Sequence, residues 1–81
     1  MDFIPFYKMN IQEYEKKRRY LSARLIEARE VAGFTQEQVA ETDIISQSEL
    51  SKIENGSRKV DFIFLQELAK LYEKPIDFFS L

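Results

Sequence analysis

In TQEQVAETDIISQSELSKIENG, residues 35–56, two helix starts lie eleven residues apart. Thr35 and Gln38 have the spacing of a capping box, in which each side chain satisfies the backbone N–H of the other. Ser46 and Glu49 repeat this spacing, so a second short helix is predicted from Ser46 to Asn55. This predicts two capped helices joined by about four residues, 42–45, which is the geometry of a helix-turn-helix.

Outside this segment the pattern is also helical. On the N-terminal side, apolar residues at 11, 14, 21, 25, 28 and 32 follow Asn10, which predicts one long helix to about Ala32, with a break near residues 20–22 as the alternative. Gly33 provides the left-handed residue that ends such a helix. On the C-terminal side, Asp61 is the predicted cap of a fourth helix with an apolar stripe at 65, 68, 69 and 72. Pro75 suits the first turn of a fifth, over 76–81.

The composition is that of a small globular protein without the usual catalytic groups. The 81 residues suffice for one domain, and the absence of Cys and His removes thiolate, imidazole and Cys/His zinc chemistry. We therefore expect no enzyme activity, no metal and no cofactor. Because no apolar run is long enough to span a bilayer and no signal peptide is evident, we expect a cytoplasmic protein.

Charge is distributed unevenly along the chain. Residues 1–32 carry seven basic and five acidic side chains, whereas residues 33–81 carry five and nine, for a net charge of −2. The densest basic cluster is residues 16–19, for which two interpretations stand: contact with phosphates, or a solvated helix face. Residues 1–9 hold five large apolar side chains, which predicts an arm that docks on another surface.

The 35–56 segment resembles the signature of the phage-repressor (lambda repressor/Cro-like, XRE) helix-turn-helix family. The likeness covers roughly residues 21–79, including the ending LAKLYEKPIDFF at 68–79. It implies an all-α, five-helix DNA-binding domain over 21–81. Residues 1–20 are then an N-terminal arm and a helical extension that lengthens the first helix.

The family likeness implies that the helix 46–55 enters the major groove with its N-terminus first. The residues expected to read base edges are Gln47, Ser48, Ser51 and Lys52; of these, Gln47 can pair bidentately with adenine. Glu49 is expected to turn its carboxylate back to the helix start. Contacts to phosphates are expected from the residues that precede or follow the reading face, namely Gln36, Ser46, Asn55, Ser57, Arg58 and Lys59.

In the resembling family, residues at the positions of Arg29 and Glu54 pair beneath the recognition helix, so we expect a structural ion pair. The turn departs from the family pattern, which has a leucine-glycine pair where this chain has Asp43 and Ile44. Because β-branched residues tolerate positive φ poorly, the turn must either adopt another geometry or shift by one residue.

Aromatic residues near the C-terminus exceed what one small domain can bury, which predicts association. We expect a homodimer on a palindromic operator in double-stranded DNA, with an interface of Phe62, Phe64, Phe78, Phe79 and Leu81, to which the N-terminal arm could add. The alternative is an aromatic core that lies wholly within one chain. The leading hypothesis is a sequence-specific DNA-binding regulator, with repression as the expected effect. The alternative is a protein-interaction or antitoxin-type module that keeps the fold but binds a protein partner.

Overall fold

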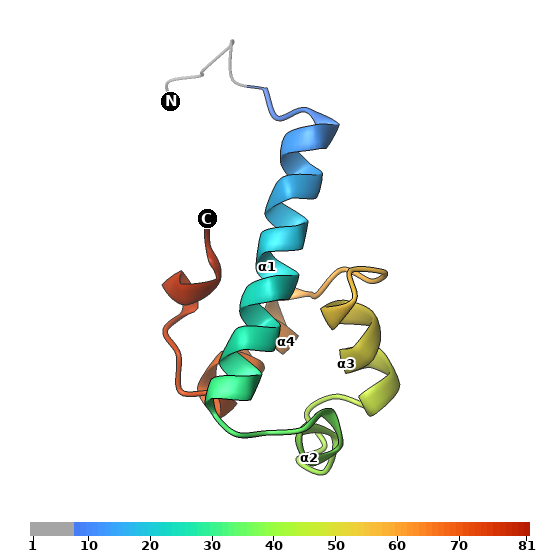
Figure 1. Ribbon diagram of the computed structural model, residues 1–81, viewed down its shortest axis with the longest axis vertical. Helices are drawn as coiled ribbons and strands as arrows, with labels where there is room; N and C mark the ends of the chain where they lie inside the picture. The colour runs from blue at the N-terminus through green and yellow to red at the C-terminus, as the bar shows by residue number, and fades with distance from the viewer. Residues whose placement is uncertain (1–7) are drawn as a thin grey trace.

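The computed structural model describes residues 8–81, which form four α-helices followed by a short 3-10 helix (Figure 1). The α-helices are α1 (Ile11–Val31), α2 (Gln36–Ala40), α3 (Gln47–Glu54) and α4 (Phe62–Leu71), and the 3-10 helix is η1 (Ile76–Phe79). No strand occurs in this part of the chain. The predictions of an all-helical fold and of a helix-turn-helix at α2 and α3 are confirmed.

α1 is one continuous helix. It starts at Asn10, whose Oδ1 accepts the Glu13 N–H at 2.8 Å, and it runs through residues 20–22 without the break left open as an alternative. Its C-terminal half packs into the body of the protein, whereas its N-terminal half projects beyond the other helices (Figure 1). The expected docking of the arm 1–9 concerns residues that lie mostly outside the described range, which begins at residue 8.

Three helices end in the same hydrogen-bonded turn. After α1, α3 and α4, the chain passes through a left-handed residue: Gly33 at φ 86°, Gly56 at φ 83° and Glu73 at φ 56°. In each turn, this residue and the next donate their N–H groups to carbonyls of the last helical turn, as Lys74 does to Ala69 at 2.9 Å. This is the Schellman arrangement, and it favours glycine because glycine has no Cβ to strain. At Glu73 the same geometry is occupied by a residue with a side chain.

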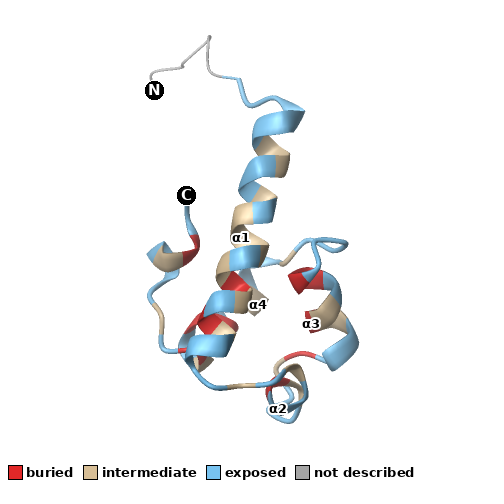
Figure 2. Cartoon of the chain, viewed as in Figure 1, coloured by how far each residue is buried: buried red, intermediate tan, exposed pale blue. Residues whose placement is uncertain are grey.

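The core lies where the C-terminal half of α1 meets α3 and α4 (Figure 2). α3 packs on both α1 and α2, and η1 packs on α1 and α4. Burying these apolar faces supplies most of the stability of such short helices, which are marginal in isolation. The buried residues are Leu25, Ala28, Val39, Ile45, Leu50, Ile53, Leu68, Ala69, Tyr72 and Phe79.

The predicted fifth helix over 76–81 is present only in part, as the 3-10 helix η1, so the count of five α-helices is not confirmed. Only the four residues of η1 are helical, and they form a 3-10 turn that no side chain caps. The Ser80 N–H makes the last bond of this turn, to the Asp77 carbonyl. The backbone of Ser80 is extended, so the helix ends there. This short element nevertheless carries Phe79 into the core.

Candidate nucleic-acid interface

α3 presents one face to the core and another to solvent. Ser46 begins it, with its Oγ accepting the Glu49 N–H at 3.1 Å. Leu50, Ile53 and Glu54 are buried, as the helical spacing requires. Of the four expected base-reading residues, Gln47, Ser48 and Lys52 are exposed and Ser51 is half-buried. Gln47, Ser48 and Lys52 therefore lie away from the core, while Ser51 is partly covered.

The turn between α2 and α3 accommodates its missing glycine by a shift of one residue. Asp43, not Ile44, adopts the left-handed conformation, at φ 62°. Aspartate is among the few side chains that tolerate this region, whereas a β-branched isoleucine is not. The Thr42 hydroxyl donates to the Val39 carbonyl at 2.6 Å, which stabilises the turn, and Ile45 is buried beneath it.

The expectation for Glu49 is wrong. Its backbone N–H joins the cap, but its carboxylate pairs with the guanidinium of Arg58 in the segment after α3. With Arg58 both partners are charged, whereas a backbone N–H carries no net charge, so the carboxylate gains more from turning toward residue 58. Arg58, expected to contact phosphate, therefore has a carboxylate partner on the same surface.

Arg29 and Glu54 form a buried, two-pronged ion pair beneath α3. Arg29 Nε donates to Glu54 Oε2 at 2.8 Å and a terminal nitrogen donates to Oε1 at 3.1 Å. The other terminal nitrogen donates to the Phe34 carbonyl at 2.8 Å. The Glu54 hydrogen bond and charge raise the pKa of Arg29 further, against the effect of burial. The pair joins α3 to α1.

Gln36 extends this network to α2. Its side-chain amide nitrogen donates to Glu54 Oε1 at 2.9 Å, so the side chain points inward and not toward a phosphate. One carboxylate thus receives donors from two other helices. A contact of Gln36 with DNA would have to come from its backbone N–H at the start of α2.

Tyr72 lies beside this network. It is buried, and its hydroxyl has no hydrogen-bond partner among residues 8–81. Burial first, and then the negative charge of Glu54, raise the pKa of Tyr72 well above its ordinary value. The hydroxyl therefore remains neutral in the folded protein.

The segment after α3 is ordered by its own side chains. Asn55 Oδ1 accepts the Ser57 N–H at 2.9 Å, and the Ser57 hydroxyl donates to the Lys52 carbonyl at 3.3 Å. Lys59 is exposed, with its Nζ 5.4 Å from the centre of the Tyr14 ring. These contacts fix the shape of the loop. Within the loop, the exposed Lys59 ammonium is the strongest candidate for contact with a DNA phosphate.

A contact that the sequence did not predict ties this loop to α1. Arg18 donates to the Gly56 carbonyl at 2.9 Å, and Ser22 donates to the Ile53 carbonyl at 3.0 Å. Of the two interpretations of the basic cluster, a solvated helix face does not fully describe Arg18, which is half-buried and bonded to the Gly56 carbonyl; contact with phosphates stays a prediction. No spacing rule connects two residues that are 38 positions apart, as Arg18 and Gly56 are.

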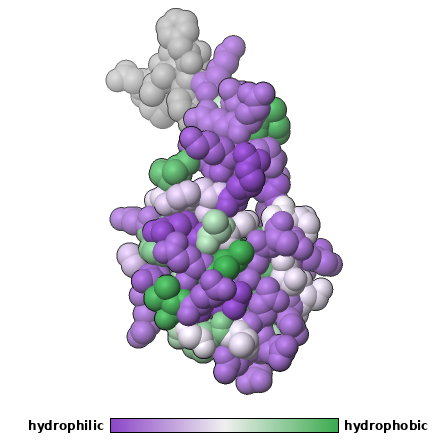
Figure 3. Space-filling view, in the orientation of Figure 1, coloured by the Kyte–Doolittle hydropathy of each residue, from purple (hydrophilic) through white to green (hydrophobic). Residues whose placement is uncertain are grey.

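The expected dimer residues do not form one exposed group. Phe79 is only 4% exposed and belongs to the core, so its assignment to the interface is wrong; α1 and α4 cover it. Phe64 and Phe78 are half-buried, while Phe62 and Leu81 are more than half exposed. On the face shown in Figure 3, hydrophobic residues form small separate patches within a mostly hydrophilic surface.

Comparison with known proteins supports the interpretation of this surface. Neither a curated protein nor a solved structure matches the chain. Within residues 8–81, no helix is both long and apolar enough to cross a membrane. A family model described as Helix-turn-helix matches residues 25–79, which include the C-terminal third of α1 and all of α2, α3, α4 and η1. The chain belongs to the XRE-type, lambda repressor/Cro-like helix-turn-helix family of DNA-binding regulators.

Proposed function

We propose that the protein is a sequence-specific transcriptional repressor that inserts α3 into the major groove. The supporting observation is the exposed N-terminal face of α3, where Gln47 and Ser48 stand clear of the core on a helix anchored by Glu54. Gln47 would pair with adenine N6 and N7, and Ser51 and Lys52 would make the neighbouring contacts. Repression would follow from occupying a promoter.

For the DNA backbone, we propose contacts from the residues that flank α3. The backbone N–H groups at the starts of α2 and α3, after Thr35 and Ser46, suit phosphate oxygens. Asn55, Ser57 and Lys59 would follow the same strand past α3. Arg58 would join them only when its pair with Glu49 opens.

A gel-shift titration at two salt concentrations, with sites selected from a random DNA pool, tests this function. Gln47→Ala should weaken discrimination of the selected site by about 1 to 3 kcal/mol, while leaving non-specific binding unchanged. Gln66→Ala, at an exposed position on α4, is the matched control. Failure to bind DNA at low salt, or equal behaviour of the two variants, would contradict the assignment.

The Glu49–Arg58 pair allows a second test, in which a substitution should strengthen DNA binding. Glu49→Gln removes the carboxylate that holds the guanidinium, so Arg58 becomes available to phosphate. DNA affinity should rise, and the slope of log K against log salt should steepen by about 0.9, the change expected for one added phosphate contact. If Glu49→Gln weakens binding instead, Arg58 does not face DNA.

We further propose that the protein binds a palindromic operator as a homodimer in the cytoplasm. Phe62 and Leu81 are the exposed members of the expected interface, and half-buried Phe64 and Phe78 could support them. Light scattering at tens of micromolar should give a dimer, and Phe62→Ser should shift it toward monomer. A wild-type monomer under these conditions would contradict the proposal.

The alternative function is a protein-interaction module with the same fold. The observation in its favour is the carboxylate of Glu49 beside Arg58, which lowers the positive charge of the surface that would face DNA. The gel-shift experiment separates the two functions, because an interaction module would show no selected DNA site.

A further inference from the structure

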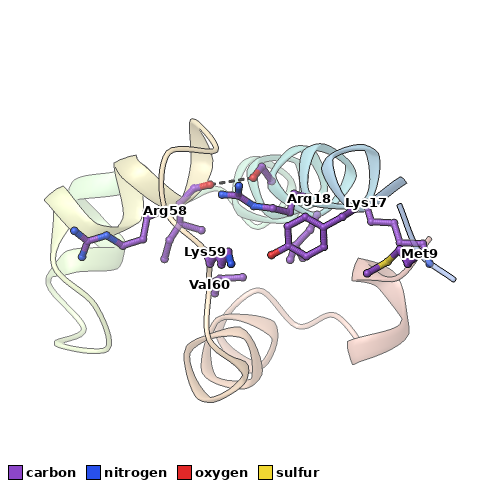
Figure 4. Close-up of a pocket in the computed structure, with 10 residues that line it drawn as sticks. Met9, Lys17, Arg18, Arg58, Lys59 and Val60 are labelled. Carbon is purple, nitrogen blue, oxygen red and sulfur yellow. Dashed lines mark hydrogen bonds between the residues drawn. The ribbon is translucent and has the colours of Figure 1, made fainter. Parts of the chain in front are cut away.

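A groove lies between the first half of α1 and the segment that follows α3 (Figure 4). Its volume is about 350 Å³. Apolar side chains from both sides line it: Met9, Tyr14, Leu21, Ile53 and Val60. The Arg18 and Ser22 hydrogen bonds to carbonyls of residues 56 and 53 hold the two sides at a fixed separation. The groove is therefore a built feature of the fold and contains none of the base-reading residues of α3.

The charged residues of the groove are all basic. Lys17, Arg18, Arg58 and Lys59 line it, and no carboxylate does. Arg58 directs its guanidinium away from the groove toward Glu49, while Lys17, Arg18 and Lys59 remain beside it (Figure 4). Arg18 is 3.7 Å from Glu15, outside the lining, and neither lysine forms an ion pair with any residue of 8–81. This leaves an apolar floor with a positive rim, in a protein whose net charge is negative.

We infer that this groove binds an acidic segment of a partner protein, with one aliphatic or aromatic side chain inserted between α1 and Val60. Carboxylates on either side of that anchor would match Lys17 and Lys59. The apolar floor argues against duplex DNA as the occupant, because a phosphate backbone offers no apolar group to fill it. The positive rim argues against a purely apolar ligand, which would leave the cations unmatched. The inference does not depend on the proposed repressor function, but the two share Lys59, so DNA and the peptide would compete for that ammonium.

Fluorescence anisotropy with the full chain tests this inference. The probe is a fluorescein-labelled peptide in which one leucine lies between two pairs of glutamates, and the matched probe has serine in place of the leucine. The leucine peptide should bind saturably and about tenfold more tightly than the serine peptide, as expected for burial of one aliphatic side chain. Equal binding of the two peptides, or no saturable binding below about 1 mM, would overturn the inference.

Charge reversal locates the binding site. The double variant Lys17→Glu, Lys59→Glu should weaken binding of the leucine peptide about tenfold, as expected for the loss of two exposed charge contacts. Lys16→Glu, next to Lys17 but outside the lining, should change binding less than about twofold. Circular dichroism melts would verify that each variant folds.

Two results would contradict the location or the class of ligand. If Lys16→Glu weakens binding as much as the double variant does, the peptide is attracted by the general charge of α1 and not by the groove. If a duplex of arbitrary sequence displaces the peptide and binds more tightly with the same dependence on Lys17, the groove is a phosphate-binding surface.

Discussion

Glu54→Gln should destabilise the domain far more than the same substitution at an exposed glutamate. The Glu54 side chain is 4% exposed and accepts three hydrogen bonds, two from Arg29 and one from Gln36. The substitution keeps the shape of the side chain but leaves the guanidinium, itself 13% exposed, without a countercharge. Breaking one partner of a buried pair costs about 3 to 5 kcal/mol.

This loss would be a large part of the total stability, which is about 4 to 12 kcal/mol for a domain of this length. Urea unfolding followed by circular dichroism measures it. With a slope near 1 kcal/mol per molar urea, the midpoint should fall by about 3 M or more. Glu67→Gln is the matched control, since Glu67 is half exposed and, within residues 8–81, pairs only with exposed Lys70; it should cost less than about 1 kcal/mol.

The double variant Arg29→Met, Glu54→Leu completes the thermodynamic cycle. Replacing both charges by apolar groups removes the stranded charge, so the double variant should be more stable than the sum of the single losses by about 2 kcal/mol or more. The stabilising role of the Arg29–Glu54 pair is refuted if the stability losses of the single variants sum to that of the double variant. It is also refuted if the losses for Glu54→Gln and Glu67→Gln differ by less than about 1 kcal/mol.

Other predictions concern the helix ends and Tyr72. Gly56→Ala should destabilise by about 1 kcal/mol through backbone strain alone, because within residues 8–81 nothing beyond the adjoining residues lies within 4 Å of the added Cβ. Glu73→Gly should stabilise by a similar amount, and thermal unfolding measures both changes. Tyr72→Phe should stabilise by about 1 kcal/mol, because it removes a buried hydroxyl without a partner among residues 8–81. Folding raises the pKa of Tyr72, so the unfolded chain loses this proton at a lower pH than the folded protein does. The free energy of unfolding should therefore decline as the pH rises above the ordinary tyrosine pKa of about 10. Tyr72→Phe should make that decline shallower, and an unchanged decline would contradict the raised pKa of Tyr72.

Features fixed within a few residues could be predicted from the sequence. Thr35, Ser46 and Asp61 cap helices as predicted, and Gly33 and Gly56 end them, because each signal acts within one helical turn. Side chains with competing partners could not be predicted. Glu49 had a near partner in the cap and a stronger one at residue 58, and the choice depends on where the loop folds.

Burial near the C-terminus also depended on tertiary structure. Phe78 and Phe79 are adjacent aromatics with the same composition signal, yet Phe79 is in the core. Phe78 stays half-buried, and the Arg24 guanidinium lies 3.5 Å from its ring centre. A helical pattern could not separate them, because the segment forms a 3-10 turn that packs against the distant α1. The groove between α1 and the segment after α3 could not be predicted from the sequence either, because it also depends on contacts between distant parts of the chain.

The Glu54 carboxylate has a consequence for how this chain can drift in sequence. Because α1 and α2 both contact α3 through that one group, the orientation of α3 is supported from beneath as well as by the turn at 42–45. The turn can then vary in sequence, as its left-handed Asp43 illustrates, with less effect on the direction of the helix. Positions 29, 36 and 54, by contrast, should change together or stay fixed.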